Sequence, residues 1–202
     1  MPRFATAAIS SGATTADRAT VVPLDIGWLV CVADGVGGIA GGARAADLFV
    51  TGAQRTVCGA GFDLTSPSAW AALVQDLDHE IAAEPRAGET TGIALAVTSG
   101  LVVGASCGVS RALLLTATGW RDLTSEQHRK PRLGTGRAWA QPFTAEAHGT
   151  LVVGTDGLFD YVKLDEICRT VLLASEDAAD ILIRLELDRY RTPPDDRPRP
   201  DA

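Results

Sequence analysis

The stretch VADGVGG at residues 32–38 decides how this chain folds. It closes an apolar run, residues 27–33, that predicts a strand buried on both faces. Asp34 follows this run, and the next residues are mostly glycines, which let a backbone turn sharply and come close to a ligand. A carboxylate at the end of a buried strand is suited to hold a cation, with the carbonyl of Gly35 as a further oxygen ligand.

A second corner of the same kind lies at residues 155–160, TDGLFD, where Asp156 follows the apolar strand expected at 151–155. Asp-Gly is a common turn, so each corner alone has that simpler explanation. Two such corners after buried strands, however, can bring two carboxylates together, which is unfavourable unless a cation lies between them. Asp17, just before the first strand, and Asp195-Asp196 near the end are further candidate ligands.

The hydrophobic pattern predicts strands that follow one another too closely for parallel crossovers, so they pair antiparallel. Helices are expected on either side of them, one beginning at Ser66-Pro67 and another with Ser175 as its N-cap. Strands in hairpins with helices in pairs predict an α+β layered fold. The strands are expected at 19–23, 27–33, 90–98, 101–106, 110–116 and 151–155, and the helices at 43–57, 67–83, 164–173 and 176–188.

Composition limits the class of protein. The chain has 202 residues, 46% apolar and 21% charged, which suits one ordinary globular domain. A net charge of −7 argues against binding to nucleic acid or to an anionic membrane. We expect no signal peptide, because residues 1–4 lead into no long apolar run, and no apolar stretch reaches the ~20 residues that a membrane span needs. The four cysteines are widely spaced, so we expect reduced, mostly buried thiols and a cytoplasmic protein.

Five short motifs, taken together, resemble the PPM (type 2C) metal-dependent serine/threonine protein phosphatases. Each motif is weak alone, but their order and spacing agree with the family over roughly residues 10–196. Residues 130–136, KPRLGTG, and the short length resemble the compact bacterial branch. The motifs are ADGVGG with GARAA at residues 33–46, GETT at 88–91, GVSR at 108–111, LT at 123–124 and TDGLFD at 155–160.

The resemblance implies a four-layer α-β-β-α sandwich of two mainly antiparallel sheets, with two Mn²⁺ or Mg²⁺ ions between them. Asp34 would bridge both metals, Gly35 would offer its carbonyl, and Asp156 would bind one metal. Asp195 matches the first aspartate of the family's terminal Asp-Asp or Asp-Asn motif, with Asp196 and Asp201 left open as alternatives. Asp17 matches an early acidic residue that acts through water.

The implied activity is hydrolysis of phosphoserine or phosphothreonine in a phosphorylated protein, in bacterial signalling, by a metal-activated water with Asp34 and Asp156 as the catalytic residues. We expect a monomer with one phosphatase domain over residues 1–196, followed by an irregular Pro/Arg-rich tail over 197–202.

The sequence departs from the family at several positions. Ala16 stands where many members have glutamate, Val36 where some have histidine, and Val109 where aspartate is usual; no arginine occurs at residues 12–16. These departures support an alternative in which a catalytically weak or silent phosphatase fold acts as a binding module.

A second alternative comes from Gly35-x-Gly37-x-x-Ala40, which fits the dinucleotide-binding fingerprint after a strand. Against this alternative, Asp34 would place a negatively charged carboxylate beside the negatively charged pyrophosphate. The antiparallel hairpins expected next also lack the second βαβ unit that this fold requires.

Overall fold

The computed structural model describes residues 16–36, 40–174 and 177–191, and in this part of the chain the strands form two antiparallel sheets. The larger sheet has the strand order β1-β2-β3-β4-β7, and the smaller one has the order β6-β5-β8. The strands are β1 (Arg18–Leu24), β2 (Gly27–Ala33), β3 (Gly92–Thr98), β4 (Leu101–Cys107), β5 (Arg111–Thr116), β6 (Gly119–Asp122), β7 (Gln141–Glu146) and β8 (Thr150–Gly154).

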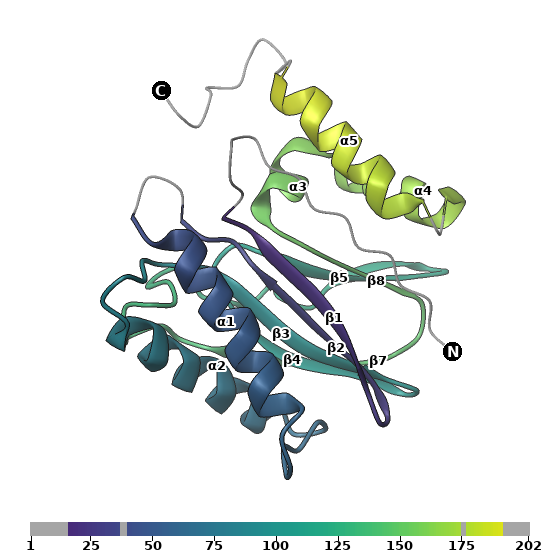
Figure 1. The fold of residues 1–202 in the computed structure, drawn as a ribbon. Helices are drawn as coiled ribbons and strands as arrows, with labels where there is room; N and C mark the ends of the chain where they lie inside the picture. The colour runs from purple at the N-terminus through teal and green to yellow at the C-terminus, as the bar shows by residue number, and fades with distance from the viewer. Residues whose placement is uncertain (1–15, 37–39, 175–176, 192–202) are drawn as a thin grey trace.

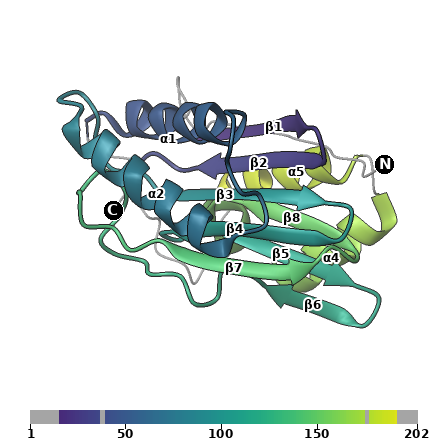
Figure 2. The same cartoon turned by 90° about the horizontal axis from the view of Figure 1, so that it is seen from below.

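Helices cover the outer face of each sheet, which gives four layers (Figures 1 and 2). Helices α1 and α2 lie on the larger sheet, while α3, α4 and α5 lie beside the smaller one. The helices are α1 (Gly42–Val57), α2 (Pro67–Ala83), α3 (Asp156–Tyr161), α4 (Leu164–Ala174) and α5 (Ala178–Arg191).

Three apolar clusters fill the spaces between the layers. One buries Phe49 and Trp70 between the larger sheet and its helices. A second, including Leu95 and Leu114, lies between the two sheets, and a third, including Ile167, lies between the smaller sheet and α3–α5. The burial of apolar side chains on both faces of the sheets explains why strands such as β3 are apolar almost throughout. The predicted α-β-β-α sandwich is therefore confirmed.

The strands that the pattern predicted are present with small shifts at their ends, and α2 begins as expected at Ser66, whose side chain accepts the N–H of Ala69. Ser175, the predicted N-cap of the last helix, lies outside the described residues. The sequence did not predict β6, β7 or α3 as separate elements. The four cysteines are free, as expected. Cys31 and Cys107 are buried and Cys168 is partly buried, but Cys58, just past the end of α1, is exposed, so the expectation of mostly buried thiols holds only in part.

Strand β2 pairs antiparallel with β1 on one side and with β3 on the other. A dinucleotide-binding βαβ unit needs the strand before the glycine-rich turn to pair in parallel with the next one. The antiparallel pairing of β2 with β3 therefore excludes that alternative. Among the described residues, none of the helices combines the length and the apolar character needed to cross a membrane.

Candidate functional site

Asp34 stands directly after β2, and its backbone is fixed from two sides. Its carbonyl accepts the N–H of Thr91 at 2.9 Å and the hydroxyl of Thr90 at 2.8 Å, and its N–H donates to the Thr91 hydroxyl at 3.2 Å. The Thr91 hydroxyl is itself paired with Ser110 at 2.7 Å, and both side chains are buried. The side chain of Asp34 therefore projects from a rigid position.

Residues beyond β2 continue into a short ladder that extends the larger sheet. Gly35 forms an isolated antiparallel bridge with Thr90, which bridges in turn to Leu133. A Cβ on Gly35 would lie only 2.4 Å from the carbonyl oxygen of Gly42, so the close approach of α1 requires glycine here. The ladder brings Arg132, the neighbour of Leu133, next to Asp34.

Asp156 is the first residue of α3, two residues after the end of β8. The backbone N–H of Gly157 donates to its carboxylate. This position at a strand-to-helix corner directs the carboxylate from the smaller sheet toward the space near the end of β2. The two predicted Asp-Gly corners therefore meet, although they belong to different sheets.

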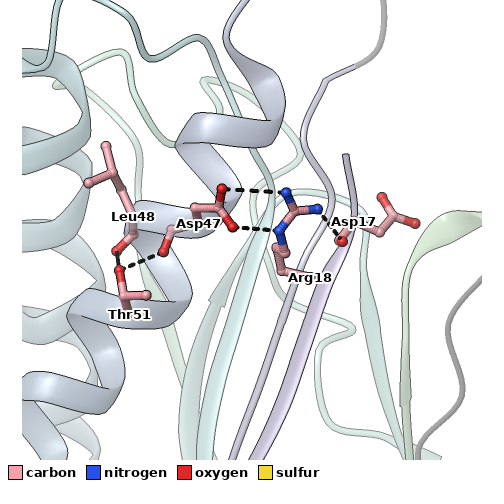
Figure 3. A network of polar contacts seen from close by, with 5 residues as sticks. All are labelled: Asp17, Arg18, Asp47, Leu48 and Thr51. Atoms are coloured by element: carbon pink, nitrogen blue, oxygen red, sulfur yellow. Dashed lines mark hydrogen bonds and ion pairs between the residues drawn. The ribbon is translucent and has the colours of Figure 1, made fainter. Parts of the chain in front are cut away.

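Asp17 precedes β1, and its backbone is held through Arg18 (Figure 3). The Arg18 guanidinium pairs with Asp47 on α1 and donates a hydrogen bond to the Asp17 carbonyl at 2.8 Å. The Asp17 carboxylate points away from Arg18 in the same view and accepts a hydrogen bond from the Thr155 hydroxyl at 3.3 Å. Asp17 thus links the larger sheet to the corner that carries Asp156.

The three carboxyl groups form a row with Asp34 in the middle, because both Asp17 and Asp156 lie near enough to Asp34 to shift its pKa. Burial, followed by the contact with Asp17, raises the pKa of Asp34 to about 7. Burial and the charge of Asp34 raise the pKa of Asp156 to about 6, and burial also raises the pKa of Asp17. Acidic groups therefore gather here, and the described residues only partly offset their mutual repulsion.

Two further charged side chains border the row. The positive charge of Arg132, like the interaction with Asp156, partly offsets the rise in the pKa of Asp34, and the Nε of Arg132 is buried without a hydrogen-bond partner in the described residues. Glu186 on α5 is a further acidic group near the row, and burial and then the proximity of Asp156 raise the pKa of its carboxyl. The cluster combines an excess of carboxylates with one guanidinium at its edge.

Carboxylate oxygens are the ligands that Mg²⁺ and Mn²⁺ prefer, so this set of donors fits a hard divalent cation. Within the described ranges, however, no three acidic, histidine or cysteine side chains already surround a common point as metal ligands do. Of the predicted ligands, Asp17, Asp34, Gly35 and Asp156 lie in one region, whereas Asp195, Asp196 and Asp201 lie outside the described residues.

The sequence prediction did not include Glu186 or Arg132 among the site residues. A signal for Glu186 was present: it follows Leu182 by four residues and so shares the face of α5 that carries this buried leucine. A glutamate on the buried face of a helix is unusual and marks a functional candidate. The sequence carries no comparable signal for Arg132. Its position is set by the bridge between Thr90 and Leu133, two residues that lie far apart in the chain.

The fold is shared with solved bacterial phosphatases. The serine/threonine phosphatase Stp1 from Staphylococcus aureus aligns with a TM-score of 0.79 and 20% identity, over 93% of this chain and 89% of that one. The serine/threonine phosphatase PstP/Ppp of Mycobacterium tuberculosis aligns with a TM-score of 0.70 and 22% identity, over 89% and 88% of the two chains. A structure of the PstP catalytic domain in complex with two manganese ions aligns at 0.71 and 24% identity, over 89% and 87%.

No protein-family model matches the sequence, and a search of curated proteins also finds no match. The structural alignments cover nearly the whole chain at low identity. The chain therefore has the fold of bacterial serine/threonine phosphatases, as the resemblance to the PPM family predicted.

Proposed function

We propose that this chain is a metal-dependent protein phosphatase that hydrolyses phosphoserine or phosphothreonine. The observation that carries the proposal is the meeting of Asp34 and Asp156, from two different sheets, in a fold shared with serine/threonine phosphatases. The carboxylates would hold two Mn²⁺ or Mg²⁺ ions, and a phosphatase of this fold has been solved with two manganese ions. The ligands would be Asp17, Asp34, the Gly35 carbonyl, Asp156 and Asp195.

When bound, divalent cations in such a site lower the pKa of water and offset negative charge on phosphoryl oxygens. The residues of the chain prepare the site for this chemistry. Asp34 would provide the central carboxylate, because its backbone is locked by Thr90 and Thr91 and its side chain contacts both other carboxyl groups. Preorganisation of this kind avoids the cost of ordering the groups during the reaction.

Arg132 would bind the phosphoryl group of the substrate. Its guanidinium lies beside Asp34, and its weak contact with Glu89, at 4.0 Å, leaves it available to a stronger partner. A phosphate oxygen would satisfy the buried Nε, which has no partner in the described residues. Arg132 would thus replace the arginine that many family members carry near the N-terminus and that residues 12–16 of this chain lack.

The critical test is turnover of p-nitrophenyl phosphate and of a phosphothreonine peptide, with and without Mn²⁺. Activity should appear with Mn²⁺ or Mg²⁺ and disappear when EDTA is present. Turnover that survives complete chelation would contradict the two-metal proposal. Mn²⁺ binding without turnover would instead favour the alternative of a catalytically silent binding module. No contact among the described residues favours this alternative.

A phosphorylated protein is the proposed partner, and we further propose one catalytic domain, a monomer and a cytoplasmic location with a role in signalling. Size-exclusion chromatography with light scattering tests the monomer. Limited proteolysis tests the single domain, since a second folding unit would release a separate stable fragment.

A further inference from the structure

Glu186 lies on the face of α5 that packs toward the smaller sheet. Leu182, one turn earlier, is buried in the apolar cluster between this sheet and α3–α5, and Leu185 packs against the same cluster. This packing orients the helix, so the side chain of Glu186 extends toward the first turn of α3 rather than into solvent. A charged residue at such a position requires a compensating partner.

The carboxylate of Glu186 lies against Gly157, the residue that follows Asp156. A Cβ built on Gly157 would lie 2.5 Å from Glu186 Oε1, and the other neighbours within 4 Å are farther away. Gly157 does not have the positive φ that favours glycine, so its backbone would accept alanine in the helix. The space for the Glu186 carboxylate therefore accounts for glycine at this position better than backbone conformation does.

The surroundings of Glu186 are negative. It interacts repulsively with Asp156 and also with Asp17. Burial and the charge of Asp156 both raise the pKa of the Glu186 carboxyl, so both disfavour its charged form. A half-buried carboxylate directed at two others is unstable without a positive partner.

We propose that Glu186 is a further carboxylate ligand of the divalent-cation site, and that Gly157 lacks a side chain so that this ligand can reach it. The inference rests on the metal-dependent function proposed above. It assigns to helix α5 a part in metal binding in addition to its packing. The main competing explanation is that Glu186 only holds the N-terminus of α3 against α5.

Direct measurement of Mn²⁺ binding tests the assignment without relying on activity. The electron paramagnetic resonance signal of free Mn²⁺ gives the dissociation constants for the full chain and its variants. Glu186→Gln should weaken binding at one site about 10-fold or more, because a charged oxygen is lost from a hard-cation site. Asp180→Asn, at an exposed position on the same helix, is the matched control and should bind Mn²⁺ like the unmodified chain.

Gly157→Ala provides an independent variant. The added Cβ meets the flexible end of Glu186, which can move aside without disturbing the fold. Gly157→Ala should weaken Mn²⁺ binding to a similar extent, and adding it to Glu186→Gln should cost little more, since both changes act on one contact.

The outcomes separate this inference from the proposed function. If Asp156→Asn weakens Mn²⁺ binding but Glu186→Gln does not, the inference is overturned and the metal-dependent function stands. If the unmodified chain binds no Mn²⁺, both the assignment of Glu186 and the proposed metal-dependent function are contradicted. Urea unfolding in EDTA completes the test: we expect Glu186→Gln to be at least as stable as the unmodified chain. A loss of stability with unchanged Mn²⁺ binding would assign Glu186 to helix packing alone.

Discussion

The carboxyl groups of Asp34 and Asp156 lie close enough across the boundary between the two sheets for each to shift the pKa of the other. Asp34 follows β2 of the larger sheet, and Asp156 begins the helix after β8 of the smaller one. Two acidic groups in contact repel each other unless a proton or a cation lies between them. The sandwich therefore brings together charges that destabilise the metal-free protein, a pattern that is expected where a site serves function.

Replacement of either aspartate by asparagine keeps the shape of the side chain and removes its charge. Asp34→Asn and Asp156→Asn should each reduce Mn²⁺-dependent turnover at least ~100-fold, because in the proposed function these carboxylates would hold the cations that activate water. Steady-state kinetics with p-nitrophenyl phosphate measure the loss. Asp25→Asn, in the exposed turn between β1 and β2, is the charge-matched control and should retain normal activity. Near-normal turnover by Asp156→Asn would show that the Asp156-Gly157 corner is only a turn and has no role in catalysis.

The stability of the metal-free protein should depend on pH in a direction set by the raised pKa values. Asp34, with a pKa of about 7, binds more protons in the folded state than in the unfolded state, where its pKa is near 3.8. Its stabilising contribution is complete below the unfolded value and is lost as the pH rises through the folded value. In EDTA, the free energy of unfolding should therefore decrease between about pH 4 and pH 7.

Asp34→Asn isolates this contribution. The variant should gain stability relative to the unmodified chain as the pH rises over the same window, by roughly 1–2 kcal/mol after allowance for solvent screening. Urea denaturation at several pH values measures the difference, and saturating Mn²⁺ should reverse it, because only the unmodified chain then gains the full binding energy. A difference that does not vary with pH would show that Asp34 is ionised normally.

Arg132 offers a test of substrate binding that leaves the carboxylates intact. Arg132→Ala should raise the KM for a phosphopeptide about 10-fold or more and weaken inhibition by inorganic phosphate, since a charge-assisted hydrogen bond is lost. Its removal should leave Mn²⁺ affinity unchanged or slightly higher, because a positive charge beside Asp34 disappears. Arg137→Ala, at an exposed position of the same loop, should change neither constant. An unchanged KM for Arg132→Ala would exclude it from phosphate binding.

The sequence was sufficient to predict the elements whose apolar pattern is strong. Strand β2 is apolar throughout, and helix α2 carries a serine N-cap followed by proline, so both were predicted nearly residue for residue. Strand β6, with the sequence GWRD, carries almost no apolar pattern and is largely exposed. Strand β7 contains Pro142, which disfavours a strand assignment although an edge strand tolerates it. These two strands are held by pairing with β5 and β4, which a local pattern does not reveal.

The residues of the candidate site likewise divide into those that the sequence predicted and those that it did not. Asp34 and Asp156 are visible because each follows its own strand, and family motifs carry both. Glu186 and Arg132 enter the site only through long-range packing, by way of α5 against α3 and the bridge between Thr90 and Leu133. Contacts of this kind depend on how the layers stack, so local sequence spacing does not locate them.

Asp78 allows a prediction about the loop that carries Arg132. It is fully buried on α2, and its carboxylate accepts backbone N–H groups from Gly134, Thr135, Gly136 and Ala138 at 2.7 to 3.1 Å. Gly134 and Gly136 have φ values of 96° and 67°, a left-handed conformation that lets successive N–H groups converge on one anion. The LGTG sequence at 133–136 thus wraps the loop around a buried charge.

Asp78→Asn should lower the free energy of unfolding by about 2–3 kcal/mol, because the amide replaces one charged acceptor oxygen with a donor that faces other donors. The loop would then lose the support that holds Leu133 against Thr90, so the KM for a phosphopeptide should rise together with the loss of stability. Asp76→Asn, at an exposed position on the same helix, should leave both quantities unchanged. Urea denaturation and steady-state kinetics on the two variants measure both effects. If Asp78→Asn lowers stability but leaves the KM unaltered, the loop positions Arg132 without help from Asp78.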